Sequence, residues 1–339
     1  MRTSRKLSHA LFSLFALVLM SAAALAADPG TPYPANSPVS DQKAGSVLFY
    51  NIYTSNSANA ATQNTRINIT NTSSTHAAFV HMYFVAEGCA VADAFICLTA
   101  NQTASFLTSD LDPDINGYIV AVAVDPDTGC PTSFNFLIGD LYVKAPATFA
   151  AGAVGPFFAN LAAEAFSARY DGDLSSCRNN PNSPTATLNF NNQEYDAPPA
   201  VLAVSNIPDQ TTNSTLLILN AFGGSLATTA NTIGRVFGIL YDDAENAFSF
   251  TEAVGSCHNR RLVTAFRTTP RVNGIITPGR SGWLKLWNSG SGTPGLLGSV
   301  INANAQVGQQ ANAFIGGHNL HKLTLTTGSY TVPVFPPSC

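Results

Sequence analysis

TRINITNT, residues 65–72, shows the alternation from which we predict the fold class. Its two isoleucines, Ile67 and Ile69, alternate with Arg, Asn and Thr, so an extended segment would have one apolar face and one polar face exposed to solvent. Short β-branched and aromatic runs of this kind, separated by Asn, Gly, Asp and Pro, fill residues 46–145. This spacing predicts an antiparallel all-β sandwich in the first part of the chain.

A second series of strand-like runs starts near Ala200 and follows the order of the first. The matched pairs are TRINITNT with STLLILNAF (214–222), AFVHMYFV (78–85) with RVFGILYDD (235–243), NGYIVAVAV (116–124) with SGWLKLWNS (281–289), and SFNFLIGDLYV (133–143) with GLLGSVINAN (295–304). We therefore expect two similar sandwiches in tandem, the first at residues 44–146 and the second at residues 199–339.

The segment between the two series, residues 147–198, differs in kind. Pro156 could begin a helix, and apolar residues from Phe158 to Phe166 recur at the i, i+3, i+4, i+7, i+8 positions of one helical face. The rest of the segment is rich in Asn and Pro. We expect a structured connector that contains one short amphipathic helix near residues 157–170.

The repeated pattern resembles a known class of domain. In both series a strand precedes a loop, LTANQTASF (98–106) or ITPGRSGW (276–283), that leads to a glycine followed by an aromatic residue. The arrangement resembles the immunoglobulin-like sandwich repeats of exported bacterial proteins, over residues 46–145 and 199–300. Such domains serve as spacers, adhesins and carbohydrate-binding modules, so the resemblance implies a non-catalytic role and assigns no functional residue.

The N-terminus has the organisation of a secretory signal peptide, residues 1–26. A basic start is followed by an apolar stretch from Leu11 to Met20 and by an Ala-Leu-Ala motif that ends at Ala26. No later apolar run reaches the roughly 18 residues that a membrane-spanning helix needs. We expect a secreted protein, periplasmic or extracellular after cleavage near Ala26, with no transmembrane segment in the mature chain.

Six cysteines follow the signal peptide: Cys89, Cys97, Cys130, Cys177, Cys257 and Cys339. An even number in an exported chain predicts disulfides, although six cysteines allow 15 pairings. Cys89 and Cys97 are close enough in sequence to staple one hairpin, and the last two cysteines are the only ones in the C-terminal half. By elimination the remaining two would pair. A thiolate nucleophile at Cys257 is the alternative, but an oxidising compartment consumes free thiols.

Charge is distributed unevenly along the chain. Residues 44–146 carry two bases and eight acids, whereas residues 199–339 carry eight bases and five acids. A surface of one sign attracts anionic polymers or an oppositely charged partner, so the acidic first domain and the basic second domain could drive self-association. The alternative is that the arginines are scattered and form ion pairs with the acidic domain. We expect no nucleic-acid partner.

Candidate metal ligands occur in loops. Five carboxylates lie in two loops of the first series: Asp110, Asp112, Asp114, Asp125 and Asp127. Oxygen-rich loops can hold Ca²⁺, but the EF-hand spacing is absent and the same sequences are ordinary turn formers. His318 and His321 could offer two imidazoles to a metal, or could simply belong to the loop before the last strands.

No catalytic motif identifies an enzyme. The sequence has no G-x-S-x-G and no P-loop, and it offers no credible Ser-His-Asp set. A pair of glycosidase carboxylates would be recognised by its separation in space, which sequence does not show. A secreted hydrolase with an unrecognised site therefore stands as an alternative, and no residue is assigned a catalytic role.

Both tryptophans lie in GWLKLW, residues 282–287. In a strand, Trp283, Lys285 and Trp287 share one face, and the two leucines between them share the other, core-facing side. The rings are either covered by the connector helix or the neighbouring sandwich, or they form a platform on which a sugar stacks while Lys285 or Arg280 meets an anionic group.

We expect an exported structural or binding protein of the cell envelope or extracellular space; the alternative is a carbohydrate-binding protein that uses this strand, with an anionic glycan as its partner.

Overall fold

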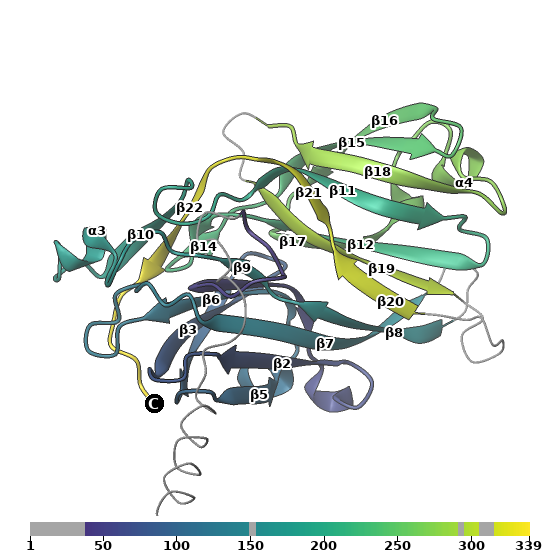
Figure 1. Ribbon diagram of the computed structural model, residues 1–339. Coiled ribbons are helices and arrows are strands. Elements are labelled where there is room, and N and C mark those ends of the chain that lie inside the picture. Colours follow the sequence, from purple (N-terminus) through teal and green to yellow (C-terminus); the bar gives the residue numbers. More distant parts are fainter. Residues whose placement is uncertain (1–37, 149–153, 291–294, 305–314) are drawn as a thin grey trace, which may run out of the picture. The chain divides into compact units, whose positions relative to one another are not determined.

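The computed structural model describes residues 38–148, 154–290, 295–304 and 315–339 (Figure 1). The predicted signal peptide, residues 1–26, lies outside the described residues. Strands make up most of the described chain, so the expected all-β class is confirmed, and the described strands form five sheets. No helix among the described residues is long and apolar enough to cross a membrane.

The first half of the chain forms two sheets that face each other. The first sheet has the order β4 (Val91–Leu98), β3 (Ala78–Ala86), β6 (Asn116–Val124), β1 (Val47–Thr54), β9 (Glu164–Phe166), and the second has the order β5 (Thr103–Leu107), β2 (Asn64–Asn71), β7 (Leu137–Thr148), β8 (Val154–Ala162). Strand β2 holds most of TRINITNT, and its isoleucines are fully buried between the two sheets while Arg66 is exposed. The alternation in the sequence therefore sets which face of β2 enters the core.

The second half also forms two facing sheets. One has the order β16 (Ala247–Val254), β15 (Gly234–Asp242), β18 (Ser281–Asn288), β11 (Pro199–Pro208), β21 (His321–Leu325), and the other has the order β17 (His258–Leu262), β12 (Asn213–Ala221), β19 (Leu296–Asn304), β20 (Ile315–Asn319). Leucine, isoleucine and valine side chains of both sheets form one buried cluster between them. The chain passes from β20 to β21, and thus from one sheet to the other, through the single residue Leu320.

The fifth sheet combines strands that lie far apart in the sequence. Its order is β10 (Thr185–Phe190), β22 (Gly328–Pro333), β13 (Gly224–Ser225), β14 (Thr229–Ala230). Its apolar side chains share a cluster with the face of the β1 sheet that points away from β2, including the rings of Phe49, Phe222 and Tyr330. The helical elements of the described chain are single turns: η2 (Ser57–Asn59), α2 (Thr108–Leu111), α3 (Ser175–Arg178), η3 (Val263–Ala265) and α4 (Val272–Ile275).

The expected architecture of two tandem immunoglobulin-like sandwiches is wrong. The sheet of β1 is buried on both faces, because Leu48 belongs to the cluster shared with β2 and Phe49 to the cluster shared with the fifth sheet. The first cluster also contains Ile218 and Ile301 of the second half. Periodicity predicts strands and their inward faces, but it does not determine which sheet each strand joins, so the tandem repeat inferred from the order of the runs does not describe the molecule. The domain boundaries at residues 146 and 198 stay predictions.

The connector helix expected near residues 157–170 is also wrong. The segment forms β8 and β9, and β8 pairs with β7 from Asp140↔Ala162 to Thr148↔Val154. Phe157, Ala159 and Leu161 are buried and alternate with more exposed residues, which is a period of two. A short apolar run fits both the helical period of 3.6 and the strand period of 2. The edge of β7 offers hydrogen-bond partners along its whole length, which favours the strand.

All six cysteines form disulfides: Cys89–Cys257, Cys97–Cys339 and Cys130–Cys177. The Cys130–Cys177 pair is confirmed, and the other two expected pairs are wrong. Cys89 lies in the turn between β3 and β4, whereas Cys97 lies six residues along β4 from its first residue, so extended backbone separates them by roughly 20 Å. Since Cys257 is bonded to Cys89, it is not a free nucleophile.

Candidate functional site

Strand β18 places both tryptophans on the outer face of its sheet. Leu284 and Leu286 are 1% and 0% exposed and belong to the core, as their alternation predicts. Trp283 is 36% exposed, and Lys285 and Trp287 are half-buried. The expected connector helix does not exist, and the core between the two sheets of this half lies on the other side of β18. The two rings therefore stand on an open surface.

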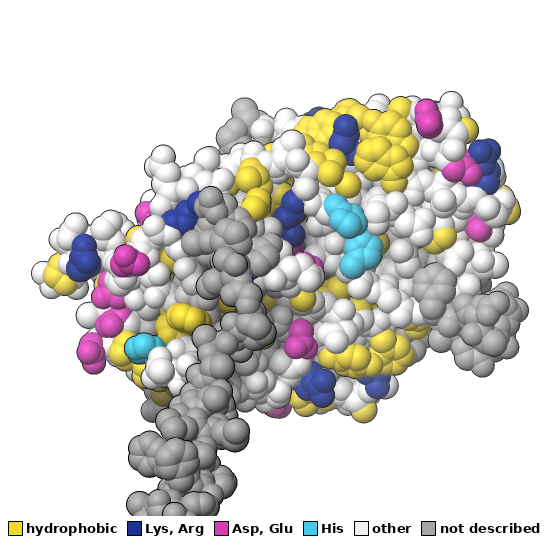
Figure 2. Space-filling model, in the orientation of Figure 1, with side chains coloured by type: hydrophobic (Ala, Val, Ile, Leu, Met, Phe, Trp, Pro, Cys, Tyr) yellow, Lys and Arg dark blue, Asp and Glu magenta, His cyan; other side chains and the backbone are white. Residues whose placement is uncertain are grey.

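Neighbouring strand β15 extends this surface with further aromatic side chains. The rings of Tyr241 and Trp283 stack with their centres 4.5 Å apart and their planes at 9°. Phe237 and Trp287 form a second pair at 4.8 Å. The outward-facing side chains at the centre of the two strands define an aromatic face, in which Trp283 is exposed and the others are half-buried: Phe237, Ile239, Tyr241, Trp283, Lys285 and Trp287. Figure 2 shows this face as a yellow area over β15 and β18 that is interrupted by dark blue.

Lys285 lies between the two tryptophans along β18 and has no acidic partner among the described residues. Its cross-strand neighbours are Ile239 on β15 and Ala203 on β11. Its aliphatic stem can cover apolar surface while the ammonium group stays at the surface. The aromatic face therefore presents one unpaired positive charge at its centre.

On the other side of β18, strand β11 is irregular. Its register shifts between Val204 and Ile207, and the two residues in between, Ser205 and Asn206, are exposed. One face of the Trp283 ring stacks on Tyr241 of β15. The other face of the ring therefore points toward β11 and this polar bulge. The surface beside Trp283 thus combines an aromatic ring with hydroxyl and amide groups.

A polar pocket of about 490 Å³ adjoins the aromatic face at the β21 edge of the sheet. Its lining residues include Asp41, Gln42, Ser205, His318, His321 and Lys322. The pairing Lys285↔Ala203↔His321 joins β18, β11 and β21 in one row, so the pocket lies about 10 Å from the centre of the aromatic face. Figure 2 shows histidine side chains in cyan below the yellow area.

Arg280 borders the aromatic face but is already paired. Its guanidinium group contacts the carboxylate of Asp243 at 2.6 Å, and this hydrogen bond raises the pKa of Arg280. Both side chains are exposed, so the ion pair itself stabilises the fold little. Of the two cations predicted to meet an anionic group, only Lys285 is unpaired.

The five candidate calcium ligands do not form one site. Asp114 precedes β6 and Asp125 follows it, so a nine-residue strand of about 30 Å separates the two loops. Asp112 accepts a hydrogen bond from the Tyr53 hydroxyl, and burial raises its pKa. Asp114 accepts hydrogen bonds from the backbone and hydroxyl of Ser57, which lower its pKa. Asp110 lies in α2 beside Asp112, and Asp127 lies in the turn that Asp125 caps.

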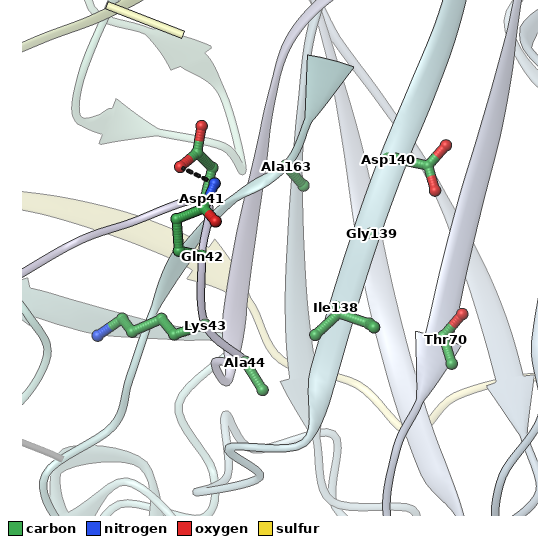
Figure 3. Close-up of a pocket in the computed structure, with 9 residues that line it drawn as sticks. All are labelled: Asp41, Gln42, Lys43, Ala44, Thr70, Ile138, Gly139, Asp140 and Ala163. Atoms are coloured by element: carbon green, nitrogen blue, oxygen red, sulfur yellow. Dashed lines mark hydrogen bonds between the residues drawn. The ribbon is translucent and has the colours of Figure 1, made fainter. Parts of the chain in front are cut away.

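A second pocket, lined by residues of the N-terminal segment and of β2 and β7, does not gather reactive groups. Figure 3 shows Asp41 and Asp140 on opposite sides of it, and Lys43 pointing away from Asp140. Asp140 accepts a hydrogen bond of 2.7 Å from Asn68. The arrangement shows no converging acid and base, so it offers no candidate catalytic centre.

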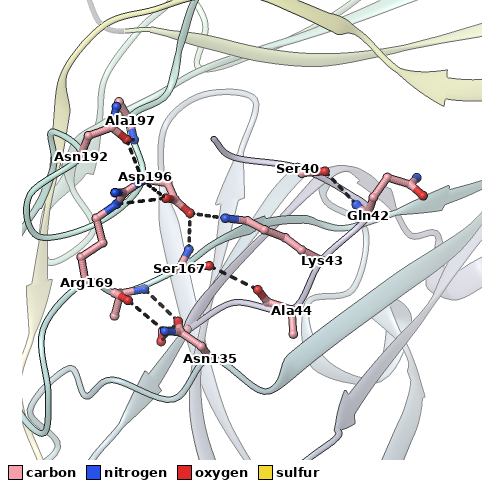
Figure 4. A network of polar contacts seen from close by, with 12 residues as sticks. Ser40, Gln42, Lys43, Ala44, Asn135, Ser167, Arg169, Asn192, Asp196 and Ala197 are labelled. Atoms are coloured by element: carbon pink, nitrogen blue, oxygen red, sulfur yellow. Dashed lines mark hydrogen bonds and ion pairs between the residues drawn. The ribbon is translucent and has the colours of Figure 1, made fainter. Parts of the chain in front are cut away.

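Lys43 instead belongs to a buried charge network that the sequence did not reveal (Figure 4). Asp196, fully buried, contacts the ammonium group of Lys43 and the guanidinium group of Arg169, the latter at 2.8 Å. It also accepts a hydrogen bond of 2.6 Å from the Ser167 amide. Burial is the main cause that lowers the pKa of Lys43. Each charged side chain of the network contacts one of opposite sign, so we assign the network a structural role.

Another buried polar chain joins the two halves of the molecule. Asn51 of β1 donates hydrogen bonds to Glu164 at 2.7 Å and to the Asn319 side chain at 2.9 Å. Asn220 of β12 donates to the Asn51 carbonyl and accepts at 2.6 Å from Nδ1 of His258. Burial raises the pKa of Glu164, whose carboxylate also contacts Lys322.

The expected attraction between the acidic and basic regions takes a limited form. The bases of residues 199–339 that form ion pairs in the described chain use acids outside residues 44–146: Arg261 with Glu252, Arg280 with Asp243, and Lys322 with Glu164. Arg260 forms no ion pair among the described residues; burial lowers its pKa, and the charge of Glu87 in the first region partly opposes this shift. Self-association through these regions stays a prediction.

No family model matches the sequence, and no curated protein matches it. Among the solved structures to which this chain is similar, the following three have low TM-scores. Thermotoga maritima 1070 is 12% identical, with a TM-score of 0.24 over 34% of this chain and 92% of that chain. The apo form of Pleurotus ostreatus lectin is 8% identical, with a TM-score of 0.18 over 85% and 86% of the two chains. Bacteroides uniformis beta-glucuronidase 2, bound covalently to cyclophellitol-6-carboxylate aziridine, is 9% identical, with a TM-score of 0.16 over 88% of this chain and 29% of that chain. The function is therefore argued from the residues of this chain alone.

Proposed function

We propose that the aromatic face binds an anionic glycan and that the protein is a non-catalytic binding protein of an oxidising compartment. The observation that carries this proposal is the ammonium group of Lys285, which forms no ion pair in the described chain and lies between the exposed Trp283 and the half-buried Trp287. A protein surface rarely leaves a group of large apolar side chains uncovered without a binding role. The lone cation at its centre favours a ligand that carries negative charge.

The spacing of the rings favours an extended ligand. Trp283 and Trp287 lie four residues apart on one strand, which places their attachment points roughly 14 Å from each other. A small compact molecule would reach one ring, whereas a polymer that runs along β18 would reach both. Sugars offer apolar C–H faces to such rings and hydroxyl groups to polar neighbours, and the bulge at Ser205 and the adjoining pocket supply those neighbours.

Three disulfides support the proposed compartment. Disulfides persist in oxidising environments and are rare where thiols are kept reduced. All six cysteines are paired, which supports such an environment. Export itself would depend on the predicted signal peptide.

The test measures the affinity of the protein for an acidic polysaccharide and for its neutral counterpart with the same backbone. We expect the protein to bind the acidic form. Trp283→Ala and Trp287→Ala should each lower the affinity at least tenfold, since central tryptophan anchors commonly contribute about 2 kcal/mol or more. Lys285→Gln should abolish the preference for the acidic over the neutral form. Tyr142→Ala is the matched control, because Tyr142 is an exposed aromatic residue, 42% accessible, on the β7 strand of another sheet. Equal affinities for all variants would overturn the proposal.

A further inference from the structure

The corner between β20 and β21 brings two exposed histidines together. His318 is the fourth residue of β20 and His321 is the first residue of β21, and their ring centres lie 5.6 Å apart. The strands belong to different sheets, so the chain turns sharply between the two imidazoles. Both rings line the polar pocket.

The two residues between the histidines are anchored in the core. The Asn319 side chain donates to Asp41 at 3.0 Å and to the Ala162 carbonyl at 2.8 Å, and it accepts from Asn51 and Ser299. Leu320 is 2% exposed, and its amide donates to the Gly298 carbonyl. The backbone that carries both imidazoles is therefore held on each side of the corner, which limits the reorganisation that binding would require.

Hydrogen bonding determines which nitrogen of His318 is available. Nδ1 lies 2.8 Å from the backbone carbonyl of Asn319, and a carbonyl oxygen only accepts, so Nδ1 carries the proton. Nε2 then keeps its lone pair. An outer contact of this kind fixes the tautomer of histidine ligands in metal sites. Two imidazoles that bind one ion at about 2.0–2.1 Å place their ring centres roughly 5 Å apart, close to the separation seen here.

The geometry points to a divalent transition-metal site formed by His318 and His321, with Zn²⁺, Ni²⁺ or Cu²⁺ as the ions that suit imidazole ligands. Water would fill the remaining positions, because no group of three or more His, Cys, Asp or Glu side chains in the described chain is placed to hold an ion. Imidazole binds metal only when it is unprotonated, so the affinity falls as the pH is lowered. This proposal rests on the two histidines and not on the aromatic face, although both sites border the polar pocket.

The experiment titrates the disulfide-intact protein with ZnCl₂ by isothermal calorimetry at neutral pH. We expect one ion per chain, and an affinity at least tenfold lower for His318→Gln and for His321→Gln. His76→Gln is the control, because His76 is an exposed histidine in another loop. Near-ultraviolet circular dichroism of each variant checks the fold.

Two results would overturn the proposal: no binding of Zn²⁺, Ni²⁺ or Cu²⁺ by the folded protein, or an affinity that neither His318→Gln nor His321→Gln changes. Glycan affinity measured with a chelator present separates the two sites, since the glycan proposal predicts that binding survives removal of the metal.

Discussion

Lys285 places a positive charge at the centre of the aromatic face. Without it, the aromatic face would be an apolar patch suited to many partners. Its cross-strand neighbours, Ala203 and Ile239, are aliphatic and it forms no ion pair among the described residues, so an anionic group on a ligand would meet an uncompensated charge. The orientation of this residue was predicted from two facts together: side chains alternate along a strand, and lysine is almost never fully buried without a partner.

His258 leads to a prediction about pH at the residue scale. It is fully buried, and burial, together with the charge of Arg260, lowers its pKa from 6.5 to about 3. Below pH 6.5 the unfolded chain therefore binds a proton that the folded chain does not, so this residue makes the fold less stable as the pH falls toward 3. The slope for one group is about 1.4 kcal/mol per pH unit.

Denaturant unfolding of the wild type and of His258→Gln between pH 6.5 and pH 4 measures this contribution. We expect the variant to lose stability less steeply than the wild type over this range, because glutamine does not titrate. His76→Gln serves as the control at an exposed site. Identical slopes for wild type and His258→Gln would show that His258 is not held neutral.

At the scale of elements, strand β4 explains why two disulfides were paired wrongly from sequence. Cys89 and Cys97 are neighbours along the chain, but a strand keeps its two ends apart, so each cysteine bonds to a distant segment. The resulting bonds close loops of 168 and 242 residues. The Cys130–Cys177 pair, which the structure has, was inferred by elimination and not from sequence separation.

Removal of disulfides tests this connectivity energetically. In the chain-entropy description, a loop of 168 residues stabilises the fold by about 5 kcal/mol and one of 47 residues by about 4 kcal/mol. The double variant Cys89→Ala/Cys257→Ala should therefore be less stable than Cys130→Ala/Cys177→Ala by about 1 kcal/mol, as measured by urea unfolding. All four cysteines are buried, so the local packing losses are comparable. A greater loss for the shorter loop would contradict the expectation.

Strands β8 and β18 show what periodicity can and cannot determine. In β18 a lysine between two tryptophans leaves one plausible orientation, and the structure has it. In β8 the apolar residues satisfied a helical pattern and a strand pattern at once, and the segment pairs as a strand with the edge of β7. Such an edge is a tertiary feature, so local sequence does not reveal it.

For the molecule as a whole, the sharing of strands and cores predicts cooperative unfolding. The fifth sheet pairs β10 with β22, and one cluster contains Ile218 and Ile301 together with side chains of β1 and β2. We expect differential scanning calorimetry to show a single transition whose calorimetric and van't Hoff enthalpies agree. Two separate transitions would instead support the domain boundaries drawn at residues 146 and 198.

Composition and periodicity predicted the all-β class, the core face of β2 and the outward tryptophans. They did not predict five sheets, because the register that places β22 beside β10 depends on contacts between residues more than 130 positions apart. The polar pocket was equally invisible, since Asp41, Ser205 and His321 come from three separate parts of the chain.

The most direct test of binding at the aromatic face uses the indole N–H signals of a ¹H–¹⁵N spectrum. The chain contains only two tryptophans, so two such signals report on Trp283 and Trp287. On titration with an oligosaccharide of an acidic polysaccharide, we predict that both signals shift until they saturate, and that the neutral counterpart leaves both in place. Two indole signals that stay unchanged up to saturating amounts of the acidic ligand would contradict glycan binding at this face.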